Sequence, residues 1–350
     1  MKALYFTGAL LLLLGVGWAQ AEPFTPGNLV LVDAAEDRLI EVTLGETEAT
    51  VVQVVKWALG DTSRRRPLGV AFDPNGTCYV GITGVPTSAT EQVDYPAGRG
   101  EVLRIKPDGT QDFFILPPEV TKGTWVSSFA PNEVFVMSNE PPPPPPSHSF
   151  LLKFSGNEIV KTTLFDVSMT LQGNGNVSHG KAMVLPDGRI LIPNGELTNQ
   201  PEYIINVFGP EGGAPKNKIV VTKSYRSLAY LEGSNEMLAI PGTGYVDRIS
   251  MDGTILGSFD FALDGLGGVW NFTLIEDGTE RFIATNHNGP AGSKSMVFIY
   301  DSKRLNELPL PQILDIVGLK NFGDADGLAT SLFDHAIVPV PSDIPDWTLF

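Results

Sequence analysis

Residues 70–80 read VAFDPNGTCYV, two short apolar runs joined by a turn at residues 73–76. Pro, Asn and Gly favour tight turns, and Asn and Gly tolerate the positive φ of hairpin turns, so this stretch predicts a β-hairpin. Comparable hairpins follow around turns at Asn132, Gly188, Gly233 and Gly278. The recurrence, at intervals of about 45 to 56 residues, is typical of a β-propeller, in which each blade is a four-stranded sheet.

Second strand pairs complete several of these units. One runs through the turn at residues 107–109, others through those at 156–157 and 252–253. At the N-terminus, residues 28–33 and 37–42 resemble second and third strands without a first strand, and residues 327–333 resemble a first strand without its blade. Pairing of these ends would close the ring and remove its open sheet edges. We therefore predict an all-β, six-bladed propeller, with a seventh partial blade over residues 336–340 as the alternative.

Composition agrees with this fold class. The 350 residues include 37 Gly and 28 Pro, and 42% are hydrophobic. Turn formers at this level, with a normal apolar fraction, favour many short strands and exclude a disordered chain, a collagen or a coiled coil. The single cysteine, Cys78, cannot form an internal disulfide, and its place in an apolar run predicts a small buried side chain.

The N-terminus has the pattern of a secretory signal peptide. Lys2 is followed by an apolar stretch and then by the Ala-Gln-Ala sequence at residues 19–21. We expect cleavage after Ala21, a propeller over residues 22–341, a tail over residues 342–350, and a secreted or periplasmic protein without a membrane span. The net charge of −16 repels phosphate groups, so nucleic acid is not expected as a partner.

Two stretches resemble known propeller families. Residues 27–42 are similar to the NHL repeat, and Asp326-Gly327-Leu328 is similar to a stretch of the six-bladed regucalcin/gluconolactonase family. In that family an Asp before Gly-Leu binds a divalent metal at the channel mouth, and the enzymes hydrolyse lactones or esters. The resemblance therefore implies Asp326, together with Asp324, as ligands of a metal such as calcium. A turn carboxylate that caps backbone amides is the other interpretation of Asp326.

The propeller resemblance also implies which loops surround the channel mouth. Polar and aromatic side chains of these loops are the candidates to bind an unknown protein or small molecule: Arg66, Trp125, His179, Lys181, Tyr225, Arg226, Asn286 and His287. His179 is the candidate for a general base, because an imidazole titrates near neutral pH. For Trp125 and Tyr225, core packing between blades is the alternative.

Three functions remain open at this point. The first is a secreted binding or scaffold protein, since no complete catalytic set stands out and no cofactor is certain. The second is a metal-dependent lactonase or esterase, as the Asp326 resemblance implies. The third is a quinone-dependent sugar dehydrogenase, in which cations such as Arg226 and Lys181 would hold a carboxylated cofactor. Whether the chain is an enzyme stays undecided.

Overall fold

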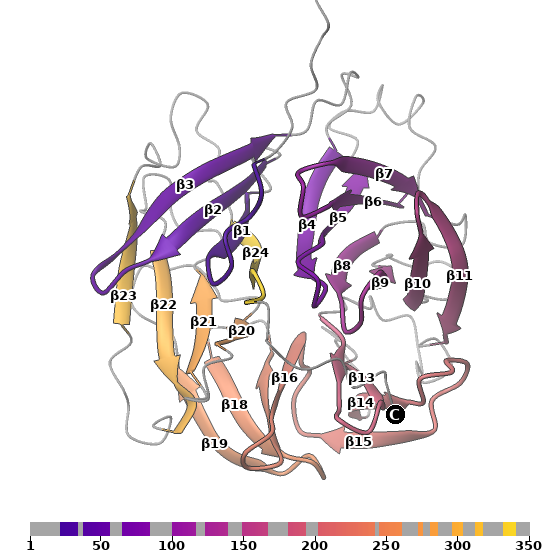
Figure 1. Ribbon diagram of the computed structural model, residues 1–350. Coiled ribbons are helices and arrows are strands. Elements are labelled where there is room, and N and C mark those ends of the chain that lie inside the picture. Colours follow the sequence, from indigo (N-terminus) through magenta and orange to yellow (C-terminus); the bar gives the residue numbers. More distant parts are fainter. Residues whose placement is uncertain are drawn as a thin grey trace, which may run out of the picture.

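The computed structural model describes residues 22–33, 38–56, 65–84, 100–116, 123–138, 149–166, 181–193, 202–241, 245–260, 272–275, 281–285, 296–303, 312–317 and 332–340. These residues form 24 β-strands in five sheets, arranged around a common centre (Figure 1). Within them, no helix is long and apolar enough to span a membrane.

Four of the sheets have four strands each, in sequence order, with antiparallel neighbours. The first contains β4 (Arg65–Phe72), β5 (Cys78–Gly84), β6 (Gly100–Ile105) and β7 (Gln111–Ile115). The second contains β8 (Gly123–Ser127), β9 (Glu133–Ser138), β10 (Ser149–Ser155) and β11 (Glu158–Phe165). The third contains β12 (Met183–Val184), β13 (Ile190–Pro193), β14 (Tyr203–Phe208) and β15 (Asn217–Val221). The fourth contains β16 (Ser227–Leu231), β17 (Glu236–Ile240), β18 (Tyr245–Ser250) and β19 (Ile255–Asp260).

The fifth sheet has eight strands, ordered β20-β21-β22-β23-β3-β2-β1-β24. Its strands are β20 (Phe272–Leu274), β21 (Arg281–Thr285), β22 (Met296–Asp301), β23 (Gln312–Val317), β3 (Glu48–Lys56), β2 (Arg38–Leu44), β1 (Leu29–Asp33) and β24 (Leu332–Ile337). All neighbours are antiparallel except β23 and β3, which pair in parallel over a short stretch. The sheet therefore consists of two four-stranded antiparallel halves joined at β23 and β3.

The N-terminal strand pairs with the last described strand, as the sequence predicts. Leu29 of β1 lies opposite Ile337 of β24, and the pairing continues to Asp33. The described residues of the closing strand are 332–337, which overlap the predicted strand over residues 327–333 at residues 332–333, and residues 327–331 lie outside the described ranges. Asp334 and His335 are polar, but the Val70 N–H and the Ile283 carbonyl on other strands supply hydrogen-bond partners that let both be buried in β24.

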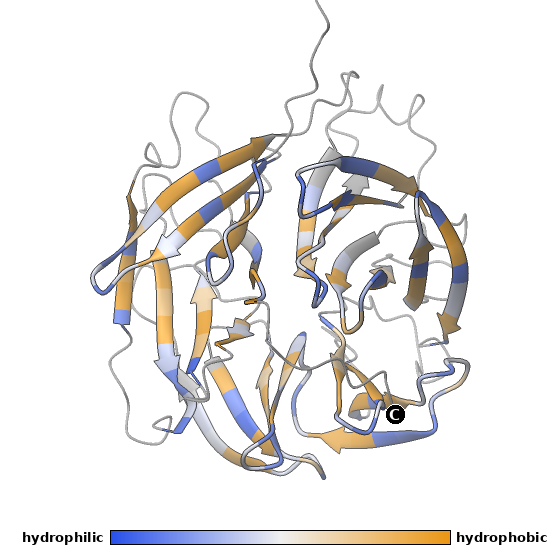
Figure 2. Ribbon diagram, viewed as in Figure 1, coloured by the Kyte–Doolittle hydropathy of each residue, from blue (hydrophilic) through white to orange (hydrophobic). Residues whose placement is uncertain are grey.

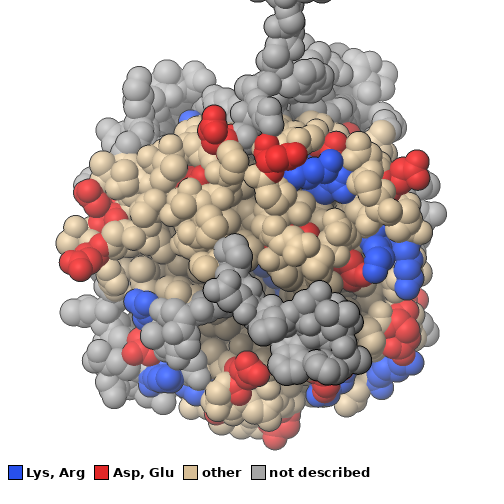
Figure 3. Space-filling model, viewed as in Figure 1, with Lys and Arg blue, Asp and Glu red and all other residues tan. Residues whose placement is uncertain are grey.

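The hydrophobic core lies between neighbouring sheets, and apolar residues follow the strands of every sheet (Figure 2). Successive side chains of β1 point to opposite faces. Leu29 and Leu31 belong to a core cluster with the β20–β23 half of the same sheet, while Val30 and Val32 belong to one with the β4–β7 sheet. Both faces of this strand are buried, and all five of its residues are inaccessible. Cys78 belongs to the same core, and burial raises the pKa of its thiol, as expected for a packing residue. On the face shown in Figure 3, charged side chains gather toward the rim.

Candidate functional site

A groove of about 430 Å³, open to solvent and lined mostly by residues of polar type, lies between the β4–β7 and β8–β11 sheets. It is formed by the β4–β5 and β6–β7 turns of one sheet and by the β8–β9 and β10–β11 turns of the next. Its walls are lined by Asn75, Thr77, Arg104, Lys106, Pro107, Asp108, Asn132 and Gly156. The groove therefore brings together residues from the turns of two consecutive sheets.

The turns have their shape because of residues that accept positive φ. Gly76 has φ 82°, Gly109 has φ 80° and Asn132 has φ 59°. Asp108 stabilises the β6–β7 turn, since its carboxylate accepts a hydrogen bond of 2.9 Å from the Thr110 backbone N–H. That hydrogen bond lowers the pKa of Asp108. These local interactions fix the walls of the groove.

Asp73 connects the two sheets beside the groove through hydrogen bonds from backbone N–H groups of both. Its Oδ1 accepts hydrogen bonds of 2.9 Å from the backbone N–H groups of Asn75 and Thr77. Its Oδ2 accepts a 2.9 Å bond from the Asn132 N–H of the neighbouring sheet and a longer one, 3.4 Å, from the Tyr79 hydroxyl. A buried carboxylate that accepts several N–H groups is a strong anchor. We expect this residue to set the distance between the two sheets.

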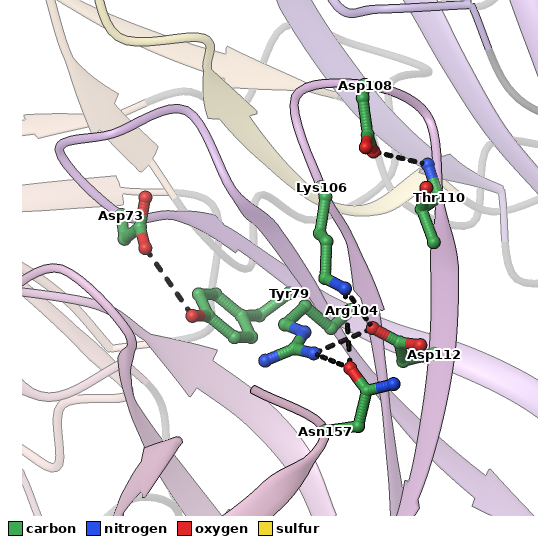
Figure 4. Close-up of polar contacts among 8 residues, drawn as sticks. All are labelled: Asp73, Tyr79, Arg104, Lys106, Asp108, Thr110, Asp112 and Asn157. Carbon is green, nitrogen blue, oxygen red and sulfur yellow. Dashed lines mark hydrogen bonds and ion pairs between the residues drawn. The ribbon is translucent and has the colours of Figure 1, made fainter. Parts of the chain in front are cut away.

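Arg104 of β6 is the buried cation of the groove. The residue is 2% exposed, and its Nη2 donates to Asp112 Oδ2 at 2.7 Å and to Asn157 Oδ1 at 3.0 Å (Figure 4). The guanidinium carbon also lies 4.8 Å from the ring centre of Phe114 and 5.4 Å from that of Phe154, within cation–π range. Its Nε has no hydrogen-bond partner among the described residues. The guanidinium is thus held rigidly with part of its donor capacity unused.

Lys106 and Asn157 lie above this cation. Lys106 Nζ is 3.1 Å from Asp112 Oδ2 and 3.3 Å from Asn157 Oδ1. Partial burial by itself raises the pKa of Asp112, but hydrogen bonds from Arg104 and Lys106 outweigh this and lower it. Asp112 is therefore ionised at neutral pH and balances one of the two cations. Because Asn157 Oδ1 faces both cations, the Nδ2 of the same amide is turned away from them (Figure 4).

At two other sheet junctions a glycine of the third-to-fourth-strand turn lies against the preceding sheet, whereas the glycine at this junction does not. In the β14–β15 turn, the Gly213 N–H donates to Leu164 O of β11 at 2.7 Å, and the Cβ of any residue replacing Gly212 would collide with the same carbonyl. In the β18–β19 turn, Gly253 lies equally close to Val220 O of β15. The corresponding glycine of the β10–β11 turn, Gly156, has no atom within 4 Å of an added Cβ. The groove lies at this open junction.

Of the residues predicted at the channel mouth, Lys181 makes the most informative contacts. It reaches from the start of β12 to the closing strand, where its Nζ lies 3.0 Å from Asp334 Oδ1 and donates to His335 O at 3.0 Å. Asp334 also accepts a 2.8 Å hydrogen bond from the Val70 N–H. Burial raises the pKa of Asp334, and Lys181 opposes that shift. The Lys181 side chain is only 14% exposed, and its contacts with Asp334 and His335 stabilise the position of β24.

The aromatic candidates lie in the core. Trp125 is buried in the cluster between the β8–β11 and β12–β15 sheets. Tyr225 is buried as well, and its hydroxyl donates to Asp247 Oδ2 at 2.8 Å. Arg226 is buried beside it, and its backbone N–H donates to Ile240 O. Trp125 and Tyr225 therefore pack in the core, which is the alternative that the sequence left open for them. Arg66 belongs to β4, and its side chain lies outside the described part.

The remaining predicted residues lie outside the described ranges: His179, Asn286, His287, Asp324 and Asp326. Among the described residues, no group of His, Cys, Asp and Glu could hold a metal ion. The calcium site and the lactonase or esterase activity inferred from Asp326 thus stay predictions. Metal analysis of the purified protein, with a lactone and ester screen before and after chelation, tests both.

The groove residues were missed because their meeting is not visible in the sequence. Arg104 stands in an apolar strand, between Leu103 and Ile105, just before a turn. A charged residue at such a position is a signal, since burial of a cation requires partners. Arg248 has the same setting in β18 and donates to Ser302 O of the next four-stranded unit at 3.2 Å. The repeated motif could have indicated an arginine that bridges sheets.

No protein-family model and no curated protein sequence matches this chain. Among solved structures, the WD40 β-propeller domain of Doa1 is similar, with 11% identity, a TM-score of 0.50 and coverage of 91% of this chain and 94% of that one. The C-terminal WD40 domain of Sif2 has 12% identity and a TM-score of 0.44, with 91% of each chain covered. Virginiamycin B lyase from Staphylococcus aureus has 9% identity and a TM-score of 0.48, with 84% of this chain and 86% of that chain covered. The likeness to Doa1, together with the ring of sheets, confirms the prediction of an all-β propeller.

Proposed function

We propose that this chain is a secreted binding or scaffold protein built on a six-bladed β-propeller. The groove between the β4–β7 and β8–β11 sheets would receive its ligand. Secretion is inferred from the signal-peptide pattern that ends at Ala21. The blade count follows if the eight-stranded sheet is divided at the parallel contact of β23 with β3, because each half is then a four-stranded antiparallel blade.

The observation that carries the proposed function is the open junction at the groove. A glycine turn lies against the outer strand of the preceding sheet at Gly212 and again at Gly253, but Gly156 leaves the corresponding space unfilled. Convergent polar groups in a concave surface are typical of ligand sites. Here they are supplied by turns held in place by buried carboxylates such as Asp73.

Capture from the extracellular fraction of the native host tests the proposal. We compare the full chain with Asn75→Trp, which fills the groove from an exposed turn position, and with Lys218→Trp, an exposed control on β15. A partner retained by the parent and by Lys218→Trp, but lost by Asn75→Trp, supports binding in the groove. Equal retention of the partner by all three proteins would contradict binding in the groove and would leave the channel mouth as the candidate site.

A further inference from the structure

We propose that the folded protein protects the bond between Ala21 and Glu22 from cleavage, so that the signal peptide must be removed before the ring closes. The inference rests on the proposed secretion and adds to it the order of processing and folding. It concerns the first described segment, residues 22–28, which we call the N-terminal strap. The enzyme class is a signal peptidase, because an Ala-x-Ala sequence precedes the bond.

A buried carboxylate of β2 holds the strap. Glu41 is inaccessible to solvent, and its Oε1 accepts hydrogen bonds of 2.8 Å from the Thr25 N–H and of 2.6 Å from Asn28 Nδ2. Its Oε2 accepts a 2.6 Å bond from Gln53 Nε2, and the same nitrogen donates to Glu22 O at 3.1 Å. A carboxylate that accepts several N–H groups is a strong anchor. The held residues therefore begin directly after the cleavage site.

The strap also contacts both sides of the seam at which the ring closes, where β1 and β24 lie beside β4 (Figure 1). The Gly27 N–H donates to Val338 O, and the Val338 N–H donates to Asn28 O, each at 2.9 Å, so the strap extends the pairing of β1 with β24. On the other side, the Phe24 ring packs edge-on against Phe72 of β4, with ring centres 5.4 Å apart. Complete docking of the strap thus requires both the last described strand and the β4–β7 sheet.

The strap leaves little room for a protease at the bond. Phe24 is the third residue after the bond, and three extended residues span at most about 11 Å. A protease encloses the bond and its neighbours in an extended form, which is why cleavage concentrates in exposed, flexible segments. Pro23 and Pro26 stiffen the strap, because the ring of each fixes φ. Cleavage of the folded protein therefore requires the strap to leave its contacts first.

The signal sequence independently favours export of an unfolded chain. Lys2 is the only basic residue among residues 1–21, so they lack the twin-arginine sequence that directs folded proteins to a separate export route. Val338, which pairs with the strap, follows the last described strand and is made after nearly all of the sequence. At about 5–20 residues per second, synthesis of such a chain takes about 20–70 s. The strap cannot dock completely during this time, and the bond stays open to cleavage.

The experiment uses the full chain, folded in detergent solution and incubated with purified signal peptidase. A second precursor carries a flexible Gly-Ser linker between Ala21 and Glu22, and about ten residues give it a reach of about 15–20 Å. Its control carries the same linker in the exposed β12–β13 turn, after Asp187. Mass spectrometry identifies the new N-terminus. We expect the folded parent and the control to be cleaved at least about tenfold more slowly than the linker precursor, because cleavage follows the population of the open form.

Two substitutions loosen the strap without moving the bond. Glu41→Ala removes its buried anchor, and Phe24→Ala removes its ring contact with β4. Each should raise the cleavage rate of the folded precursor about threefold or more. Glu202→Ala, at an exposed position beside β14, should leave the rate unchanged.

The outcomes are distinguishable. Cleavage of the folded parent as fast as that of the linker precursor would overturn the proposal, and so would unchanged cleavage of folded Phe24→Ala, the milder of the two substitutions. If the linker precursor is not cleaved after Ala21, the signal-peptide interpretation is wrong, and the proposed secretion fails together with this inference. Binding in the groove is tested separately, by the capture experiment.

Discussion

His335 of the closing strand should make the stability of the protein fall at acid pH, and substitution of this one side chain tests the prediction. The residue is completely buried. Its Nε2 lies 3.1 Å from Ile283 O, and its Nδ1 lies 3.4 Å from the Thr285 hydroxyl. Burial, and to a lesser extent the charge of Lys181, lower the pKa of this imidazole from 6.5 to about 3. The folded protein therefore keeps His335 neutral under conditions where the unfolded chain binds a proton.

The sign and size follow from this difference. Below about pH 6.5 the unfolded chain takes up a proton that the folded protein does not, so stability falls as pH falls, until the folded pKa is reached. The loss is about 1.4 kcal/mol for each pH unit, or about 3 kcal/mol at about pH 4.5. A typical domain has a stability of about 5–15 kcal/mol, so this is a large share. Asp334, whose pKa burial raises, has the opposite sign, because the folded protein binds its proton more readily than the unfolded chain.

The assay is urea unfolding of the parent protein, His335→Gln and Ile283→Val between about pH 7 and pH 4.5. His335→Gln keeps a donor for Ile283 O and removes the titration, so its stability should fall by about 3 kcal/mol less than that of the parent over this range. Ile283→Val removes a buried methylene and should lower stability by about 1 kcal/mol at every pH. Other groups, Asp334 included, are common to all three proteins. If His335→Gln shows the same pH dependence as the parent, His335 is not held neutral by burial, and the reasoning is refuted.

Three further predictions concern the joints between sheets. Asp73→Ala leaves the buried Thr77 N–H and the Asn132 N–H without their acceptor and should cost about 2–4 kcal/mol in urea unfolding, whereas Asp187→Ala, at an exposed turn, should cost less than about 1 kcal/mol. Gly253→Ala forces a Cβ against Val220 O at φ 93° and should lower the melting temperature clearly more than Gly156→Ala, where only the positive φ of 56° opposes the side chain; equal effects would show that the β18–β19 turn does not lie against β15. A chain that ends at Gly323 lacks β24 and should aggregate or fail to melt cooperatively, since the lost strand buries apolar surface worth on the order of 5 kcal/mol or more; a soluble protein with a cooperative transition would contradict the observed closure.

Much of the fold was predictable because hairpin turns are encoded locally. The turns at Gly76, Asn132, Gly188, Gly109, Gly156 and Gly253 all have the positive φ that their residue type favours. In the turn around Gly233, the residue with positive φ is Asn235. The burial of Asp334 and His335 in the closing strand could not be predicted, because both are polar and only the partners on other strands explain why they are buried.

The groove could not be predicted, because it depends on distances between sheets. Neither the Arg104 to Asn157 hydrogen bond nor the missing closure at Gly156 follows from local patterns. A turn glycine has the same local geometry whether or not a neighbouring strand approaches it. The prediction of channel-mouth residues rested on a general property of propellers. Of the predicted side chains that the structure describes, Trp125, Tyr225 and Arg226 are buried, and Lys181 pairs with Asp334 of the closing strand.

The pairing of β1 with β24 also has a consequence for how the chain folds. The partners Leu29 and Ile337 come from opposite ends of the described chain, so this contact has nearly the greatest sequence separation available. Contacts of high separation form slowly, because a long loop must be ordered before they contribute. During synthesis, β1 has no inner neighbour until the last described strand has been made, and its edge is exposed to other chains meanwhile. Refolding should therefore be slow and concentration-dependent, with aggregation competing most strongly just before the ring closes.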